Sequence, residues 1–313
     1  MHGIRQPHSV DLDNKGEVPV LELHSINRSF GERRVLHDVS FTVGSGRMTG
    51  FVGSNGAGKT TAMRVILGVL TPDSGTVTLN GTELTAEQRT RFGYMPEERG
   101  LYPKMRVLEQ IVYLGRLHGM SPTQALNSAD TLLERLGLGE RKNDTVETLS
   151  LGNQQRAQIA AALVHDPEVL VLDEPFSGLD PIAVEVVMSV LKSYTAQGAP
   201  VLFSSHQLDI VERLCDDLVV IADGEIRASG SREGLRTEHS RDRYELQLDG
   251  DTGWLRSEPG VEVVEFDGGY AMFEVDTEVT AQRILQRAIQ TAPVLRFAPQ
   301  QPSLSQIFKE VIR

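Results

Sequence analysis

The stretch GSNGAGKT at residues 53–60 decides the fold. Its glycine, four variable residues and Gly-Lys-Thr match the P-loop pattern G-x-x-x-x-G-K-S/T. The segment at 46–52 predicts a strand before it and the segment at 60–70 predicts a helix after it, which is the context that the motif requires. Consecutive backbone N–H groups of such a loop surround phosphate oxygens, and the helix N-terminus adds its dipole. The stretch therefore predicts a nucleoside triphosphate site rather than a glycine-rich turn that only caps a helix.

Two side chains of this loop carry the predicted chemistry. Lys59 is expected to reach the β- and γ-phosphates and to act in catalysis, and the Thr60 hydroxyl is expected to bind Mg²⁺. The other predicted nucleotide contacts come from the same loop and the first helical turn: Gly53, Ser54, Asn55, Gly56, Ala57, Gly58 and Thr61.

An acidic pair ends the apolar run VLVLDEP at 169–175, which is typical of a buried parallel strand. Asp173 is predicted to hold Mg²⁺ through a water molecule at the carboxyl edge of the sheet. Glu174 is the predicted general base that polarises the attacking water. An Asp-Glu pair alone also fits a solvated strand end, so this prediction depends on the P-loop earlier in the chain.

His206 ends another apolar strand, in VLFSSHQLD at 201–209, and is expected at the same edge. A lone histidine there is more often a surface or capping residue. Beside a P-loop and an Asp-Glu pair, a catalytic contact with the γ-phosphate is the better hypothesis.

Composition limits the class of protein. The chain has 313 residues, 40% of them hydrophobic, which suits one large domain and a smaller one. The formal net charge of −12 argues against a broad electrostatic contact with nucleic acid. The single cysteine, Cys215, excludes an internal disulfide framework. No stretch approaches the roughly 18–20 apolar residues of a membrane helix, so at a membrane another chain must do the spanning.

The order of strands and helices predicts an α/β fold around a mainly parallel sheet, with an antiparallel part near its start. Residues 1–17 are expected to form a flexible arm and residues 18–235 the first domain, with a helical insert at about 98–148. The hydrophilic segment RTEHSRDR (236–243) is expected to be a linker. A small α+β domain is expected over 236–313.

Six motifs follow one another over about residues 18–232. They are Phe30, the P-loop, GYMPEERG (93–100), LSLGNQQ (149–155), VLVLDEPFSGLD (169–180) and SSH (204–206). In this order they resemble the ATP-binding subunits of ABC transporters. The resemblance implies a P-loop ATPase domain with antiparallel and helical subdomains. It also implies that two such subunits face head to tail, with each ATP between one P-loop and the other subunit's signature motif.

Further site residues follow from the resemblance. Phe30 would stack on adenine in place of the commoner tyrosine, although the same pattern fits a core aromatic residue. Ser150 would cap the helix after the signature motif. With Gly152 and Asn153 it would bind the γ-phosphate held by the second subunit. Asp180 would lie at the interface between the two subunits.

Two positions depart from the family pattern. Glu97 stands where a glutamine is usual; its carboxylate can accept Mg²⁺ but cannot donate as an amide does, and a solvated loop acid is the alternative. Leu151 replaces the first glycine of the signature. Both departures resemble the sodium-export-type (Nat-like) ATPases of ABC-2-type transporters. PEERGLYPKM (96–105) and the tail PSLSQIFKEVI (302–312) resemble the same subgroup.

The resemblance implies an ATPase that uses ATP and Mg²⁺ to drive transport, in the export direction, at the cytoplasmic face of the cell membrane. It would need a separate integral membrane permease, docked on the helical insert, and a second ATP-binding subunit that is a copy of this chain or a related one. The alternative is a soluble ABC-type ATPase acting on a macromolecular complex. A P-loop kinase or GTPase does not account for LSLGNQQ or His206. For the C-terminal domain, a dimerisation or stability role is favoured over a regulatory ligand site.

Overall fold

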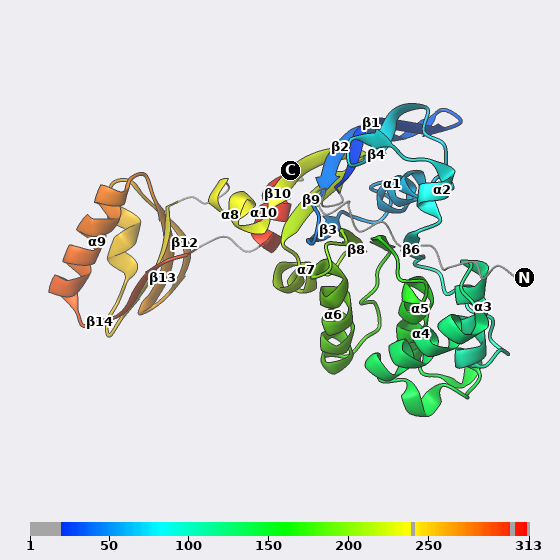
Figure 1. The fold of residues 1–313 in the computed structure, drawn as a ribbon. Coiled ribbons are helices and arrows are strands. Elements are labelled where there is room, and N and C mark those ends of the chain that lie inside the picture. The colour runs from blue at the N-terminus through cyan, green and yellow to red at the C-terminus, as the bar shows by residue number, and fades with distance from the viewer. Residues whose placement is uncertain (1–19, 239–241, 301–303, 312–313) are drawn as a thin grey trace, which may run out of the picture. The chain divides into compact units, whose positions relative to one another are not determined.

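The computed structural model describes residues 20–238, 242–300 and 304–311, so the expected N-terminal arm lies outside the described residues. The chain divides into two compact units between Ser229 and Gly230. Figure 1 shows the elements of both units along the chain.

The larger sheet of the first unit has six strands in the order β10-β9-β3-β8-β7-β6. The strands β9, β3, β8, β7 and β6 run parallel to one another. Every residue of β3, β7 and β8 is buried, which explains their continuous apolar sequences. The six strands are β3 (Met48–Val52), β6 (Phe92–Met95), β7 (Val169–Leu172), β8 (Val201–Ser205), β9 (Asp217–Ala222) and β10 (Glu225–Ser231).

The second sheet of this unit is antiparallel, in the order β2-β1-β4-β5. Its strands are β1 (Leu21–Phe30), β2 (Arg33–Val43), β4 (Ser74–Leu79) and β5 (Thr82–Glu83). Asn80 and Gly81 join β4 to β5 with left-handed φ values of 54° and 72°, as a tight hairpin turn requires. The rings of Phe41 and Phe51 lie 5.1 Å apart and join the two sheets.

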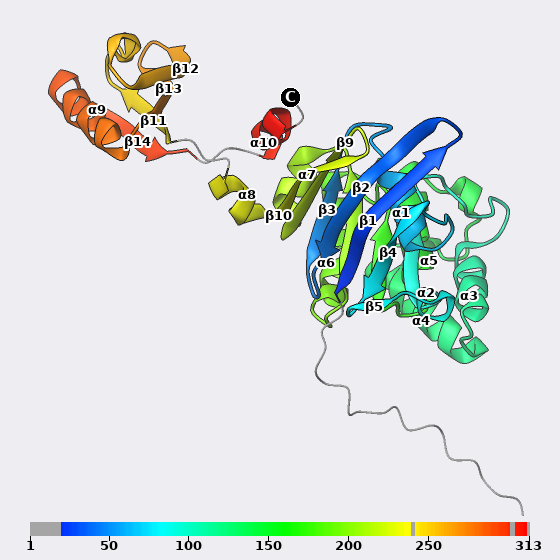
Figure 2. The ribbon, with the colours of Figure 1, turned by 90° about the horizontal axis from the view of Figure 1, so that it is seen from above.

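Helix α1 (Lys59–Ile66) packs between the two sheets (Figure 2). Its buried face, which includes Ala62, Met63 and Ile66, shares one hydrophobic core with residues of both sheets. Because α1 starts directly after the P-loop, this core fixes the loop at the carboxyl edge of the parallel strands. The remaining helices of the first unit are α2 (Ala86–Arg89), α3 (Val107–Leu117), α4 (Pro122–Arg135), α5 (Leu151–Leu163), α6 (Pro181–Thr195) and α7 (Leu208–Leu214).

Helices α3, α4 and α5 pack together at one side of the first unit (Figure 1). Helix α4 begins with a capping box at Ser121 and Gln124, and with a proline at its first position. Helix α5 ends just before β7, so the signature segment at its start and the strand that precedes Asp173 belong to consecutive elements.

The second unit has a four-stranded antiparallel sheet in the order β12-β13-β11-β14. Helix α9 packs on it around a core that includes Leu246, Phe273 and Ile284. The start of the expected linker, residues 236–238, is instead the end of α8, because this segment continues a helical turn. The elements are α8 (Arg232–Glu238), β11 (Arg243–Leu248), β12 (Val261–Asp267), β13 (Tyr270–Val275), α9 (Glu278–Thr291), β14 (Val294–Pro299) and α10 (Leu304–Val311).

The predicted fold class is confirmed: a mainly parallel α/β sheet, an antiparallel subdomain, a helical segment and a small α+β unit. Within the described ranges, none of the helices is both long and apolar enough to cross a bilayer.

Candidate functional site

The P-loop joins the end of β3 to the start of α1 and depends on its glycines. Gly56 and Gly58 have φ values of 83° and 111°, which side chains rarely adopt. A Cβ atom on Gly53 would lie 2.4 Å from the backbone oxygen of Ile221. The loop is therefore held against β9 in a shape that other residues would disturb.

Lys59 is bound to its own loop. Its Nζ donates to the backbone oxygens of Gly53 (2.7 Å) and Ser54 (3.2 Å), and only 8% of the residue is exposed. Burial lowers the pKa of the ammonium group below its usual value, whereas Glu174 and Asp173 act in the opposite direction. The cation thus lies among the acidic residues predicted for the site.

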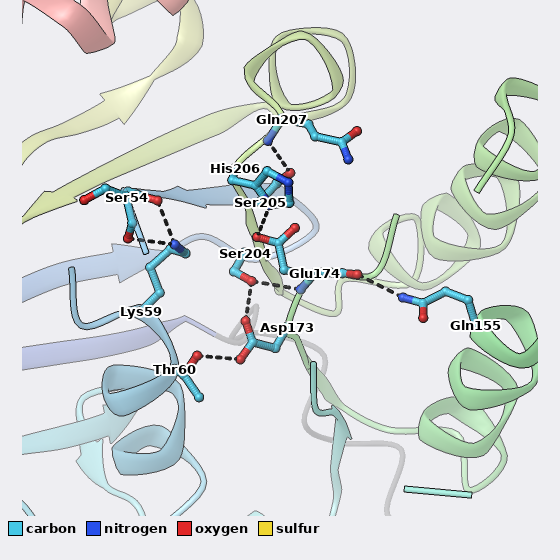
Figure 3. Close-up of polar contacts among 11 residues, drawn as sticks. Ser54, Lys59, Thr60, Gln155, Asp173, Glu174, Ser204, Ser205, His206 and Gln207 are labelled. Carbon is cyan, nitrogen blue, oxygen red and sulfur yellow. Dashed lines mark hydrogen bonds and ion pairs between the residues drawn. The ribbon is translucent and has the colours of Figure 1, made fainter. Parts of the chain in front are cut away.

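Hydrogen bonds connect the P-loop to the acidic pair (Figure 3). Thr60 Oγ1 donates to Asp173 Oδ2 at 2.8 Å, and Ser204 Oγ donates to the other oxygen of the same carboxylate. Ser204 Oγ also accepts from the backbone N–H of Glu174 at 2.8 Å. Asp173 and Ser204 are almost completely buried. One hydroxyl from β8 therefore fixes both acidic residues, and sequence reasoning did not single it out.

Glu174 is held from three directions. Its backbone has a left-handed φ of 53°, a conformation that costs a non-glycine residue about 1–3 kcal/mol. The backbone oxygen accepts from Gln155 Nε2 at 2.9 Å. Carboxylate Oε1 lies 2.9 Å from Nδ1 of His206. His206 therefore meets the predicted base directly, and Oε2 is left for another contact.

A cavity of about 460 Å³ opens beside these residues. It is lined by Arg33, Val35, Asn55, Gly56, Gly58, Lys59, Thr60, Thr61, Glu97, Asp173 and Glu174. Most of these residues were expected from the P-loop, the acidic pair and the Glu97 loop. Arg33 and Val35 were not, because nothing in the linear sequence indicates that β2 passes the loop: a Cβ atom on Gly58 would lie 3.2 Å from the Val35 backbone oxygen.

Other expected residues do not line this cavity. Ala57 is buried in the core under the loop. Gly53 and Ser54 contribute the backbone oxygens that bind Lys59. Phe30, at the end of β1, is 50% exposed, and the Arg28 guanidinium lies 5.0 Å from the centre of its ring. Adenine stacking on Phe30 stays a prediction.

The signature residues also lie outside this cavity. Ser150 caps α5 by accepting from the backbone N–H of Asn153 at 3.3 Å, and the Asn153 side chain accepts from Arg156. Leu151 is 60% exposed at the same helix end. A Cβ atom on Gly152 would lie 3.4 Å from the oxygen of Gly178, so this helix end packs close to the loop before α6.

Asp180 is a helix cap in the structure. Its side chain accepts from the backbone N–H of Ala183 at 2.8 Å, at the start of α6. The residue is exposed. Its predicted place at a subunit interface is therefore compatible with a second role in stabilising α6.

The donor set suits a hard cation. Thr60, Asp173 and Glu97 offer hydroxyl and carboxylate oxygens on the wall of the cavity, which Mg²⁺ prefers. Among the residues that the structure describes, no three His, Cys, Asp or Glu side chains form a metal-binding group. The protein would therefore supply only part of a magnesium shell, as in sites where phosphate oxygens and water complete it.

Two family models match the chain. The ABC transporter family matches residues 36–177, and the C-terminal domain of DrrA1-3-like ATP-binding proteins matches residues 230–312. The ABC transporter ATP-binding protein YhaQ of Bacillus subtilis is 35% identical over 94% of this chain and 98% of its own length. The chain belongs to the ATP-binding proteins of ABC transporters.

Other ABC transporter ATPases have similar sequences and folds. The Nod factor export ATP-binding protein I of Paraburkholderia xenovorans is 36% identical over 86% of this chain and 90% of its own. The linearmycin resistance ATP-binding protein LnrL of Bacillus subtilis is 35% identical over 69% and 70%. The solved structure of an ATP-binding subunit of an ABC transporter superposes with a TM-score of 0.65 at 31% identity, covering 70% of this chain and 92% of that one. As an ABC transporter ATPase, this chain binds ATP and works in complex with permease components.

Proposed function

We propose that this ABC transporter ATPase hydrolyses ATP to drive export, and that it belongs to the sodium-export-type (Nat-like) subgroup of ABC-2-type transporters. The names of two relatives, for Nod factor export and linearmycin resistance, support the outward direction. PEERGLYPKM at 96–105 and the signature with Leu151 support the subgroup. In this proposal the ATPase domain spans residues 18–235, with its helical subdomain at about 98–148, and residues 236–313 form an accessory domain.

The proposal depends on a chain of hydrogen bonds: Thr60 bonds Asp173 directly, and Ser204 joins Asp173 to Glu174. Two predicted metal ligands, Thr60 and Asp173, and the predicted base, Glu174, are thereby already in place on the wall of the cavity. Since phosphoryl transfer is catalysed mainly by positioning and by charge, such preorganisation is what the reaction needs.

Each group has an assigned role. The P-loop backbone and Lys59 bind the β- and γ-phosphates of ATP, while Thr60, Asp173 and Glu97 hold Mg²⁺. The ion, when bound, neutralises charge that develops on the phosphates. Glu174 accepts the proton of the attacking water through Oε2, because Oε1 is bonded to His206.

His206 adds a second contact. With Nδ1 turned to Glu174, its other ring nitrogen, Nε2, lies on the far side of the ring and is assigned to the γ-phosphate. Phe30 is assigned to adenine through the ring face that Arg28 does not cover.

A second ATP-binding subunit completes the site, and it is a copy of this chain or a related one. Ser150, Gly152 and Asn153 lie at the start of α5 and outside the phosphate cavity of their own chain. The exposed N-terminus of a helix attracts phosphate. We therefore assign these residues to the γ-phosphate held by the partner, with Asp180 beside them at the subunit interface.

A second cavity, of about 650 Å³ and mostly apolar, supports permease docking on the helical segment. It is lined by Tyr102, Pro103, Lys104, Met105, Tyr113 and Glu147. Tyr102 and Tyr113 are about half exposed, as is common for interface anchors. The cavity follows the Glu97 loop in sequence, so a permease segment seated there would contact the chain directly after a residue that lines the ATP site. Docking would place the chain at the cytoplasmic face of the membrane.

Affinity purification of the full chain from its own cells tests this function. We expect an integral membrane protein to co-purify with the parent and with Leu126→Glu, a charge placed on an exposed apolar residue of α4 outside the cavity. Tyr113→Glu should lose this protein, and Glu174→Gln should keep it while ATP hydrolysis by the complex stops. Co-purification of a soluble macromolecular complex in place of a membrane protein would overturn the proposal, as would an active Glu174→Gln complex.

A further inference from the structure

Two buried glutamines lie three residues apart on α5 and therefore on one face of the helix. Gln155 is 3% exposed and Gln158 is 4% exposed. Neither belongs to the P-loop or the acidic pair. Gln155 is the last residue of the signature LSLGNQQ and Gln158 follows it, and both are buried, unlike Leu151 at the start of the same helix. Buried amides persist where their hydrogen bonds are needed, so the atoms that they bind indicate what they do.

Gln155 binds the backbone of the proposed base. Its Nε2 donates to the oxygen of Glu174 at 2.9 Å, while Ser204 on the opposite side binds the N–H of the same residue at 2.8 Å (Figure 3). Glu174 has a left-handed backbone, which a non-glycine residue keeps only if its surroundings hold it there. Gln155 is one of three groups that do so, together with Ser204 and the backbone N–H of Ser177, which donates to the same Glu174 oxygen at 3.1 Å.

Gln158 binds the loop that carries Glu97. Its Nε2 donates to the oxygens of Pro96 (2.6 Å) and Glu98 (3.2 Å), the residues on either side of Glu97. The two hydrogens of one amide group can serve both carbonyls. The Gln158 Oε1 atom is buried and has no hydrogen-bond partner, so the side chain is retained for its donors alone.

The same helix begins at Ser150, which caps it. A regular α-helix transmits a displacement of one end to the other because its hydrogen bonds hold it rigid. One rigid element therefore connects the exposed signature end with the backbone of Glu174 and with the Glu97 loop.

We propose that Gln155 and Gln158 are positioning residues for ATP hydrolysis, which fix Glu174 and the Glu97 loop to the helix that carries the signature motif. A phosphate bound at Ser150 then contacts a helix that Gln155 and Gln158 already hydrogen-bond to the Glu174 backbone and to the Glu97 loop of the same chain. This inference rests on the proposed function, because it takes Glu174 as the base.

Tyr194 provides a control outside the signature motif. It lies on α6 and is buried, and its hydroxyl donates to the backbone oxygen of Leu163, at the far end of α5, at 3.2 Å. This oxygen belongs neither to the Glu174 loop nor to the Glu97 loop. Replacement of Tyr194 by phenylalanine removes a buried hydrogen bond to α5 without touching either loop.

The test compares Gln155→Met, Gln158→Met and Tyr194→Phe in the full chain. Methionine keeps the length of the glutamine side chain and removes its donors, and phenylalanine keeps the tyrosine ring and removes its hydroxyl. We expect kcat to fall at least about tenfold for Gln155→Met and Gln158→Met, since small misplacements of reacting groups are costly. ATP binding by the monomer and KM should change by less than about twofold, and Tyr194→Phe should keep kcat within about twofold of the parent. Thermal melting establishes that each variant is folded.

Equal kcat values for all three variants and the parent would overturn the inference, as would equal losses in all three, because a general effect on stability would then explain them. Gln155 and Gln158 are tested independently, so one variant that fails to fold leaves the other to decide. Glu174→Gln, measured in parallel, separates a failure of this inference from a failure of the proposed function. If Glu174→Gln is inactive and the glutamine variants are fully active, only this inference fails. If Glu174→Gln is active, the proposed function fails with it.

Discussion

The carboxyl edge of the parallel sheet and the start of α5 are built in opposite ways. At the sheet edge, hydrogen bonds join Thr60 to Asp173, and Ser204 joins Asp173 to Glu174. All of these residues except Thr60 are buried. At the start of α5, Ser150 caps its own helix, and its neighbour is 60% exposed. One region has its groups in place, whereas the other presents them to solvent.

This difference explains why a complete ATP site would need two subunits. The sheet edge can hold phosphate, metal and base from one chain. The exposed helix end has the right chemistry for an anion, but its residues do not line the phosphate cavity of their own chain. We therefore expect substitutions at the sheet edge to lower the rate of ATP hydrolysis, and substitutions at the helix end to disturb the assembly of the two subunits around ATP.

The largest effect should follow from changing the base at the sheet edge. Glu174→Gln keeps the shape of the side chain but removes the proton acceptor, so we expect ATP hydrolysis to fall by about 10²–10⁴-fold. ATP binding and ATP-dependent dimerisation should persist, which equilibrium binding and size-exclusion chromatography can measure. Glu185→Gln changes a surface acid of α6 that pairs with Arg213, and it should hydrolyse ATP at the parental rate. Near-normal turnover of Glu174→Gln would assign the base elsewhere.

A smaller effect of a different kind is expected at the helix end. Ser150→Arg places a large side chain where the partner's ATP would lie, and overpacking of an interface by this amount should reduce turnover by about tenfold or more. ATP binding by the isolated monomer should be unchanged, because Ser150 is not part of that cavity. Nucleotide titration of the monomer checks this. Loss of monomer binding would remove the distinction between the two regions.

Two adjacent serines sharpen the comparison within the sheet edge. Ser204 bonds both acidic residues, whereas Ser205 only accepts from the nearby N–H of Gln207 at 3.0 Å. Ser204→Ala should lower kcat by about 2- to 10-fold, the value of one or two hydrogen bonds. Ser205→Ala should leave kcat close to the parent, although both residues are buried. Steady-state kinetics of the two variants decides whether Ser204 positions the acids.

A substitution at the far end of α5 should alter the stability of the fold and leave ATP hydrolysis unchanged. His165, just beyond α5, stacks on His118 with ring centres 3.6 Å apart. Burial, and then the His118 ring, lowers the pKa of His165 from 6.5 to about 4. Its neutral form is thus favoured in the folded chain, so this contribution to stability is present above about pH 6.5 and is lost as the pH falls towards 4.

Replacing this histidine tests the sign of the effect. The unfolding free energy of the parent should fall between pH 7 and pH 5. In His165→Gln this fall should be smaller by about 1 kcal/mol, after allowance for the partial exposure of the ring. Urea unfolding at the two pH values measures this. An unchanged pH dependence would show that His165 titrates normally.

The sequence predicted most of the sheet edge because its residues lie in contiguous motifs. The P-loop, Asp173 with Glu174, and His206 each follow a recognisable apolar strand, and parallel strands bring their carboxyl ends together. The Asn80-Gly81 hairpin was equally predictable, since its turn chemistry is local.

Contacts across the fold could not be predicted in this way. Ser204 was passed over because its partners, Asp173 and Glu174, are about thirty residues earlier, and the distance between two strands depends on sheet order. Gln155 and Arg33 were missed for the same reason. The end of α8 was taken for a linker because a short polar helix has no apolar periodicity to indicate it.

The central claim, that ATP is held between two subunits, is tested most directly by mixing two variants with complementary damage. Ser150→Arg damages only the signature half of a site, and Lys59→Ala damages only the phosphate half. In a mixed head-to-tail dimer, one of the two sites combines the intact halves. An equal mixture should therefore recover about a quarter of the parental turnover, while each variant alone stays at or below about a tenth of it. If the mixture turns over no faster than its two components, under conditions in which the parent chain alone hydrolyses ATP, the site is not shared between copies and the account is contradicted.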